Sequence, residues 1–399
     1  MKKSIIALAA LISCLCANAQ DKGKERETFQ FTTVKENYIT PVKNQYGSNT
    51  CWCFSTTSFI ESEAIRKGWP YKDLDLAEMF TVSHEFSDRA YTYVRTGGNV
   101  KFSSGTVGRE VFINADKYGM VPQAEMQGRN YGREDDDHHE LLAGMKGFLD
   151  SIRTKPNGKL TPVWHQAIDN ILATYLGKYP ETFTYQGKQY TPQSFWQALN
   201  VKSDEYLYIT SWTDRPYYTE IAEEVADNWR WDQYWNVPLD EFMAIVDNAI
   251  MNGYTLVVDS DYSDPGIMRN GIALMPDYSA IKKAAADEGS DQAHWLGTTN
   301  SKGVYEIDWI IPELDVTPEM RMADFDNKST QDDHLMHCFG IAKDQKGNKF
   351  YMIKNSTDTK GKYDGIWYYS VPCFKSKVLD IIVHKDAVPA EIRAKLGIE

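Results

Sequence analysis

Cysteine is scarce in this chain, which contains 6 cysteines among 399 residues. Two of them, Cys14 and Cys16, lie in an apolar stretch near the N-terminus. The remaining cysteines are too few for a disulfide-stabilised scaffold; they are Cys51, Cys53, Cys338 and Cys373. Because no Cys-x-x-Cys pair occurs, a structural zinc site is not expected. We expect neither a metal nor another cofactor.

Positive charge and long apolar runs are also in short supply. Lys and Arg number 43 against 56 Asp and Glu, which gives a formal net charge of -13. Nucleic acid and anionic membrane surfaces are therefore not expected partners. After the N-terminal stretch, no apolar run is long enough to span a bilayer. The 42% content of hydrophobic residues predicts a packed core rather than disorder.

Residues 1–19 have the pattern of a secretory signal peptide. Lys2 and Lys3 precede an apolar run at 5–12, and Ala17-Asn18-Ala19 is a small-residue cleavage site. We expect cleavage before Gln20, a single domain over 20–399, and a periplasmic or secreted protein. The alternative is a lipoprotein signal in which Cys14 becomes the lipidated N-terminus.

The segment around Cys51 predicts a reactive thiol. An amphipathic run begins at Cys51, continues to about residue 67 and is stopped by Gly68. Cys51 should therefore lie in the first turn of a helix, where free N–H groups and the macrodipole favour a nucleophilic thiolate. Cys53 is the rival nucleophile, but it lies about 200° further round the helix and should be a buried core residue.

A thiol nucleophile needs a base, and His is the side chain best matched to neutral pH. His334 and His337 both lie in a predicted strand at 332–341. Because side chains alternate between faces of a strand, these two cannot both face one cleft. A turn at 344–348 and a returning strand at 350–354 lead to Asn355.

Ser48-Asn49-Thr50-Cys51-Trp52 resembles the nucleophile signature of papain-like cysteine peptidases, Cys-Gly-[Ser/Ala]-Cys-[Trp/Tyr]. Ser48 stands where that family has a disulfide-bonded Cys, which is similar to the bleomycin hydrolase and aminopeptidase C branch. Segments 190–195, 236–242 and 252–254 resemble the same branch. The resemblance implies an α+β, two-lobed fold: a helical lobe carries the Cys, and an antiparallel β lobe carries the His and Asn. The separation of Cys51 and His334 is roughly twice the ~130–150 residues of the papain type, which implies large helical insertions between residues 119 and 265.

The same resemblance implies roles for individual residues. His334-Leu335-Met336 matches the family's His-Ala-[Met/Val], which favours His334 over His337 as the base. Asn355 would orient the imidazole, although Thr357-Asp358 replaces the Trp-Gly of the family motif. Gln45 would donate its side-chain amide to the oxyanion. Gly105 is a candidate for binding substrate backbone, with a plain turn glycine as the alternative.

The expected function is hydrolysis of peptide substrates by a thiol aminopeptidase. In the aminopeptidase C branch a C-terminal arm lies in the cleft, and residues 378–389 match the last strand and the start of that arm. The chain continues only to Glu399, so the alternative is an endopeptidase with an open cleft. The resemblance also implies a possible homo-hexamer. A catalytically inactive homologue is a further alternative.

Other classes of function have weaker support. The 11 Trp and 24 Tyr could indicate a carbohydrate-binding protein or glycosidase, but no carboxylate pair stands out for glycoside chemistry and aromatic residues more often pack cores. The acidic and histidine-rich segment 134–140 could hold a metal, but it is better explained as the N-terminal cap of a helix at 141–152. Segment 259–264 begins like a calcium loop and lacks its required Gly and Glu.

Overall fold

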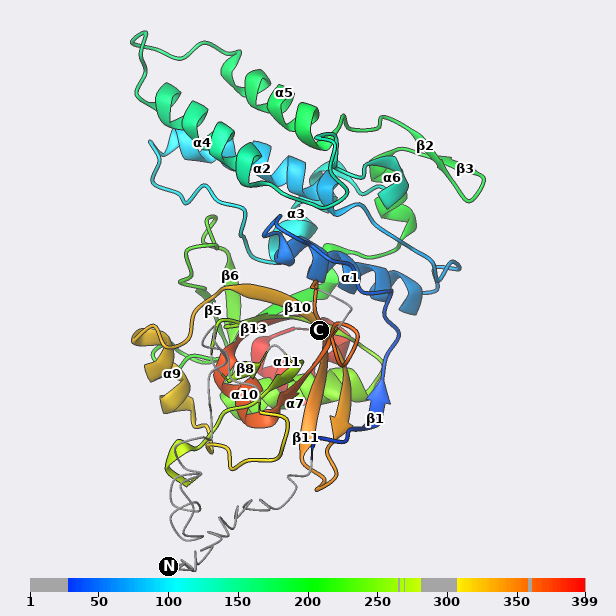
Figure 1. Cartoon of the computed structure of the whole chain (residues 1–399), viewed down its shortest axis with the longest axis vertical. Coiled ribbons are helices and arrows are strands. Elements are labelled where there is room, and N and C mark those ends of the chain that lie inside the picture. Colours follow the sequence, from blue (N-terminus) through cyan, green and yellow to red (C-terminus); the bar gives the residue numbers. More distant parts are fainter. Residues whose placement is uncertain (1–27, 265, 269, 281–306, 358–360, 399) are drawn as a thin grey trace, which may run out of the picture.

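The computed structural model describes residues 28–264, 266–268, 270–280, 307–357 and 361–398. The expected signal peptide lies outside the described residues. Figure 1 shows two parts, a mostly helical part above and a large sheet below, with α1 between them. No helix in the described part of the chain is both long and apolar enough to cross a bilayer.

The helical part surrounds the first hydrophobic core. Its helices are α1 (Cys51–Arg66), α2 (Glu78–Arg95), α3 (Arg109–Tyr118), α4 (His139–Arg153), α5 (Trp164–Leu176) and α6 (Pro192–Ala198), with the hairpin of β2 (Phe183–Tyr185) and β3 (Lys188–Tyr190). Trp52 and Phe59 of α1 are completely buried in this core. Burying each large apolar side chain contributes roughly 1.5–3 kcal/mol, so these two residues hold α1 firmly against the helical part.

The sheet has 11 strands among the described residues and is mostly antiparallel. Its order is β5-β6-β4-β13-β7-β10-β11-β12-β9-β8, and β1 pairs with β10 outside this path. The strands are β1 (Thr32–Glu36), β4 (Tyr206–Thr210), β5 (Thr219–Ala222), β6 (Gln233–Asn236), β7 (Leu256–Ser260), β8 (Ile267–Met268), β9 (Ile272–Ala273), β10 (His334–Lys343), β11 (Lys349–Lys354), β12 (Ile366–Ser370) and β13 (Val378–His384).

Alternation of side chains along the strands divides the sheet between two cores. Val257, Leu335 and Ile382 join the core of the helical part. Their strand neighbours face the second core, which α7 (Leu239–Met251) and α11 (Ala390–Leu396) cover on the opposite face. The remaining helices, α9 (Pro318–Asp326) and α10 (Val371–Lys377), contact each other at one end of the sheet. The sheet thus presents one face to α1 and the other to α7.

The observed elements agree closely with the expected ones. The helix expected from residue 51 is α1, and the strands expected at 332–341 and 350–354 are β10 and β11. The expected helical insertions are present as α4 to α7. The same stretch of chain also contributes β4, β5 and β6, which extend the sheet beyond β13. The α+β, two-lobed expectation is confirmed.

Candidate active site

A tightly turned loop delivers Cys51 to the start of α1. Tyr46 and Asn49 both adopt left-handed backbone conformations, with φ of 47° and 53°. Asn tolerates this conformation, whereas a bulky Tyr does so at a cost of order 1–3 kcal/mol. Ser48 is buried, and its Oγ donates to the Gln45 carbonyl at 2.8 Å and lies 2.7 Å from Thr50 Oγ1. Hydrogen bonds of Ser48 therefore hold the loop at the position of the family's disulfide, and Cys51 is a free cysteine.

The acidic segment 134–140 supports this loop. The N–H of Gly47 donates to the Asp136 carbonyl at 2.8 Å, and the Asp136 carboxylate pairs with Arg129. Asp137 Oδ1 accepts the N–H of His139, the first residue of α4. Asp137 thus contacts the first turn of α4, but the N-cap residue is His138 and it makes no side-chain cap hydrogen bond. Among the described residues, no group of three His, Cys, Asp or Glu is placed to hold a metal ion.

Cys51 is the first residue of α1 and is buried. The helix has no side-chain cap, so its first N–H groups are not blocked by a neighbouring side chain. The thiol nevertheless differs from the thiolate expected at a helix N-terminus. The pKa of Cys51 is raised to about 12, first by burial and then by the carboxylates of Asp332 and Asp227, against backbone N–H groups that lower it. Burial outweighs the backbone hydrogen bonds here, so the raised pKa favours the protonated thiol.

His334 opens β10 and is oriented by Asn355, the residue that follows β11. Its Nε2 lies 2.7 Å from Asn355 Oδ1 in a buried hydrogen bond. Because that oxygen only accepts, the Nε2 carries the proton and Nδ1 keeps its lone pair. Burial lowers the pKa of His334, although Asn355 opposes the shift. The two pKa shifts thus both favour the neutral forms of the imidazole and the thiol that line this cleft.

Aromatic rings from other segments cover this histidine. The ring of Tyr262 lies 4.6 Å from that of His334, and Trp367 of β12 lies 5.1 Å from Tyr262, both between centroids. Asn355 is only 1% exposed. The His334–Asn355 hydrogen bond is thus shielded from water even though Thr357 stands in place of the family's Trp.

Gln45 and Gly105 line the same cleft as Cys51 and His334. The Gln45 backbone N–H donates to the Ser356 carbonyl at 2.9 Å, which ties the nucleophile loop to the segment of Asn355. The Gly105 carbonyl accepts from Arg89 at 2.7 Å. A Cβ on Gly105 would collide with the Asp227 carboxylate, so close approach of another segment explains the glycine.

The cleft has a volume of about 340 Å³. It brings together all five expected site residues. Four of them line the cleft, namely Gln45, Cys51, Gly105 and His334. The fifth, Asn355, bonds the His334 imidazole. Three carboxylates that the sequence did not single out line it as well: Asp227, Asp332 and Asp333. Asp332 and Asp333 directly precede His334 in the sequence, and this adjacency could have predicted their place in the cleft. Asp227 comes from the insertion before β6, and no local pattern places it at Gly105.

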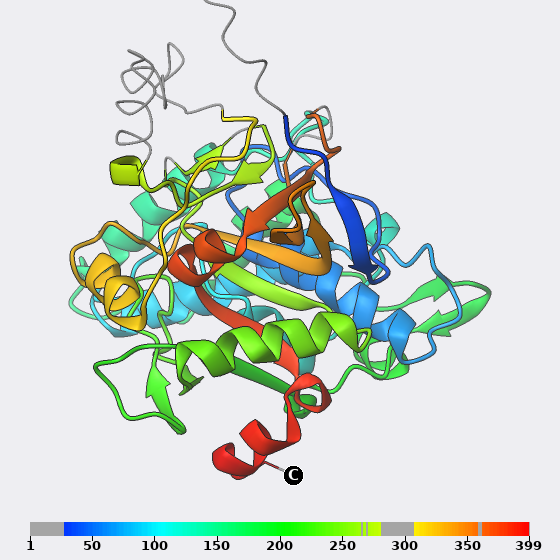
Figure 2. The same ribbon diagram turned by 90° about the horizontal axis from the view of Figure 1, so that it is seen from below.

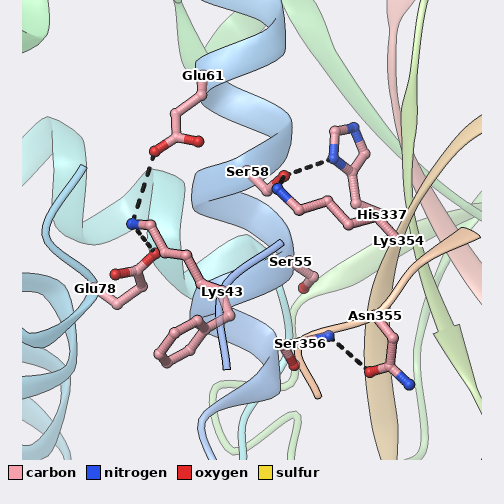
Figure 3. A pocket seen from close by; sticks show the side chains of 10 residues that line it. Lys43, Ser55, Ser58, Glu61, Glu78, His337, Lys354, Asn355 and Ser356 are labelled. Carbon is pink, nitrogen blue, oxygen red and sulfur yellow. Dashed lines mark hydrogen bonds and ion pairs between the residues drawn. The ribbon is translucent and has the colours of Figure 1, made fainter. Parts of the chain in front are cut away.

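The rival residues lie elsewhere. Cys53 is completely buried, with Sγ 3.4 Å from the Glu78 carbonyl. His337 lines a buried polar pocket behind the cleft, between α1 and β11 (Figure 3). There its Nδ1 lies 2.8 Å from Ser58 Oγ, and the Lys354 ammonium donates to the same oxygen at 2.8 Å. The two histidines of β10 therefore lie in different pockets, as the alternation of side chains along a strand predicts.

The C-terminal segment packs away from the cleft. Ile392 and Leu396 of α11 join the core on the α7 face of the sheet, and Lys395 pairs with Glu241 of α7. Figure 2 shows α11 beyond α7, at the opposite side of the sheet from α1. Within the described residues, no part of 385–398 lines the cleft.

Comparison with known proteins identifies the fold. No family model matches the chain. The crystal structure of PepW from Lactobacillus rhamnosis HN001 aligns with a TM-score of 0.66 over 92% of this chain and 84% of that chain, at 18% sequence identity. Digestive procathepsin L2 proteinase from Tenebrio molitor larval midgut aligns with a TM-score of only 0.36 and 15% identity, over 87% of this chain and 64% of that chain.

One curated sequence adds a short local similarity. Human cathepsin L2 is 32% identical over 75 residues, which is 16% of this chain and 22% of the human protein. The match thus spans about a fifth of that relative's length. Together with the two-lobed architecture, the alignment with PepW shows that the chain has a papain-like fold.

Proposed function

We propose that this protein is a cysteine peptidase that hydrolyses peptide bonds through Cys51, His334 and Asn355. The observation that carries the proposal is the shared cleft of Cys51 and His334, with the imidazole oriented by Asn355 at 2.7 Å. A nucleophile, a base and an orienting group in this order are the minimum for acyl transfer by covalent catalysis. The papain-like fold supports the same assignment.

The acylation step begins from the neutral pair. The Cys51 thiol transfers its proton to Nδ1 of His334 as Sγ attacks the scissile carbonyl carbon, which gives a tetrahedral oxyanion. The Gln45 side-chain amide and the N–H of Cys51 stabilise that oxyanion. The imidazolium then protonates the leaving amine, the C–N bond breaks, and the acyl group remains on Cys51 as a thioester.

The deacylation step reverses the roles of the same groups. His334, neutral again, removes a proton from water, whose oxygen attacks the thioester carbonyl. The second tetrahedral intermediate collapses with release of the carboxylic acid, and the imidazolium returns its proton to the Cys51 sulfur. Throughout, Asn355 holds the ring so that Nδ1 faces the sulfur.

Aminopeptidase action is the primary proposal, with endopeptidase action as the second candidate. The resemblance to the aminopeptidase C branch supports the first. The packing of α11 against α7 favours the second, because Ile392 and Leu396 are far from the cleft-lining segments. The leader pattern at 1–19 supports export to the periplasm or beyond. A hexamer is supported by the resemblance alone.

The experiment compares fluorogenic peptides with free and acetylated N-termini, for the wild type and Cys51→Ser. Hydrolysis that is lost in Cys51→Ser supports the proposed nucleophile. Restriction to the free N-terminus supports an aminopeptidase, and cleavage of both forms supports an endopeptidase. Absence of Cys51-dependent cleavage from a folded protein would overturn the proposal in favour of an inactive homologue.

A further inference from the structure

We infer that Asp227 and Asp332, backed by Asp259, form an acidic floor of the cleft that binds a cationic group of the peptide substrate. This floor would select an ammonium or guanidinium next to the bond that is cut. The inference rests on the proposed function and names the substrate class of the same site. No described segment of the C-terminal arm is needed for it.

The charges that line the cleft are strongly unbalanced. The described lining contains three carboxylates, which belong to Asp227, Asp332 and Asp333. Its basic side chains are those of Lys101 and His334. Lys101 lies 2.6 Å from Asp227, but its side chain is 51% exposed, so it can move away into solvent at little cost. Asp333 is occupied by the backbone N–H groups of Tyr262 and Ser263, at 2.6 and 3.1 Å. Asp332 and Asp227 are left to attract a cation.

A buried carboxylate behind the cleft points to the same ligand chemistry. Asp259 is 1% exposed, and neither of its carboxylate oxygens has a hydrogen-bond donor. It pairs in register with Leu335, which lines the cleft, so both side chains lie on the cleft side of the sheet. Burial and then the neighbouring Asp332 raise the pKa of Asp259 well above its usual range, and a cation held in front of this pair would oppose that shift.

Arg321 is a buried cation whose charge interacts with Glu223 and Asp380 rather than with this floor. Arg321 donates to the carbonyls of Ser211 at 3.0 Å, Lys375 at 3.0 Å and Leu379 at 2.7 Å, and also to Val378. Its hydrogen-bonding capacity is thus directed at backbone rather than at Asp259. Within the described residues, no buried Lys or Arg is recorded as a hydrogen-bond donor to Asp259 or Asp332, and Asp332 lines the cleft.

Two further observations fit a cation at this place. Asp227 lies against Gly105 at the cleft, and its side chain is only 15% exposed. Burial, and then the neighbouring Asp227, raise the pKa of Asp332 to about 7. A bound ammonium would oppose that shift and would also weaken the effect of both carboxylates on the Cys51 thiol.

The cation can come from the substrate's α-amine or from a basic side chain, and a set of four substrates separates these sources. The substrates are aminomethylcoumarin amides of Arg and norleucine, each with a free and an acetylated N-terminus. If the floor binds the α-amine, Asp227→Asn and Asp332→Asn raise KM for both free substrates by about tenfold or more, as expected for loss of a charge-assisted hydrogen bond. If it binds the side chain, the rise is confined to the two Arg substrates.

Two control variants bracket this expectation. Lys101→Met removes the counter-charge and should lower KM for the same cationic substrates, which is the opposite direction. Glu224→Gln removes an exposed negative charge from the same insertion, where it pairs with Arg215 at 3.1 Å, and should change KM less than twofold. Equal effects of Asp227→Asn on cationic and neutral substrates would overturn the inference. The inference would also be overturned if KM depended on added Ca²⁺ or EDTA and not on substrate charge, because this result would indicate a metal site.

A second measurement does not depend on peptidase activity. Aminoethyl and sulfonatoethyl methanethiosulfonate carry opposite charges, and each transfers its thioalkyl group to a cysteine with release of methanesulfinate. Relative to glutathione, Cys51 should react at least tenfold faster with the cationic reagent, and Asp227→Asn with Asp332→Asn should abolish the preference. A missing preference overturns the acidic floor. A preference without any hydrolysis overturns the proposed peptidase and leaves the floor standing.

Discussion

Nε2 of His334 and Oδ1 of Asn355 are 2.7 Å apart, and the same oxygen accepts the N–H of Ser356 at 2.7 Å. The orienting oxygen is thus itself held from behind by the backbone. Its position follows from β11, which ends at Lys354 and leaves Asn355 beside the start of β10. The imidazole is therefore fixed by a group that has little freedom to move.

Asn355→Ala should reduce kcat/KM by about 10- to 100-fold, because the imidazole loses its fixed orientation and part of its 10²–10⁴-fold contribution as acid and base. Activity requires neutral His334, so it falls as pH drops through the His334 pKa. Burial already lowers that pKa and Asn355 raises it, so the wild-type acid limb should lie below pH 6.5 and that of Asn355→Ala lower still. A pH–rate profile measures both, and an acid limb above pH 6.5 would contradict this assignment.

Gln45→Ala should lower kcat by about 10²–10³ with a small change in KM, as expected for loss of one oxyanion donor. Gln45→Glu keeps the size of the side chain without its N–H donors and should lose as much. The alkylation rate of Cys51 with iodoacetamide should remain within about twofold, since no oxyanion forms in that reaction. A matching loss in alkylation would mean that the loop, rather than the oxyanion, had been disturbed.

Gly105→Ala should destabilise the protein by about 1–3 kcal/mol, because the new methyl group meets the Asp227 carboxylate. Asp227→Ala in the same chain removes the obstacle and should recover most of that loss. Urea unfolding of the two single variants and the double variant gives the coupling free energy. Additive effects would show that Asp227 is not what demands a glycine.

Ser58→Ala should destabilise the protein by about 1–3 kcal/mol, because Lys354 and His337 both lose a hydrogen-bond partner in a buried place. Ser62→Ala is the matched control. Ser62 lies one turn further along α1, and its Oγ bonds only the Ser58 carbonyl of its own helix, at 3.2 Å. Its loss should cost less than about 0.5 kcal/mol. Equal losses in urea unfolding would refute the special role of Ser58.

Glu223→Gln should flatten the pH dependence of stability between about pH 4.5 and 7. Burial raises the pKa of Glu223 to about 7, so the folded state binds its proton more tightly than the unfolded state. The wild type therefore loses stability as pH rises through this window, by roughly 1–3 kcal/mol from this group. Gln keeps an oxygen for the Trp212 N–H. Urea unfolding at pH 5 and pH 8 tests this, and unchanged slopes for the variant would disprove it.

Local patterns predicted the elements that carry the reacting groups. The run from Cys51 became α1 and the run after Asp333 became β10, although both elements are buried on nearly all sides. The pairing of His334 with Asn355 was implied by the family resemblance, and the local hairpin of β10 and β11 brings the two residues together. These parts depend on residues that are close in the sequence, so they could be read without coordinates.

The remaining features depend on contacts between distant segments. Asp136 reaches Gly47, and Asp227 reaches Gly105, through insertions whose path no periodicity reveals. The protonation of Cys51 was missed for the same reason. A helix N-terminus alone predicts a thiolate, whereas the outcome is set by burial and by two carboxylates from elsewhere in the chain.

The polar pocket of Figure 3 also governs the alignment of the two halves of the cleft. Ser58 lies about two helical turns from Cys51, and its partners Lys354 and His337 are near neighbours of Asn355 and His334 in the sequence. An apolar contact tolerates sliding by an ångström, but these directional hydrogen bonds do not. These hydrogen bonds therefore fix the position of α1 relative to the sheet at a point distant from the reacting groups. Small shifts of α1 should misalign sulfur and imidazole long before the protein unfolds.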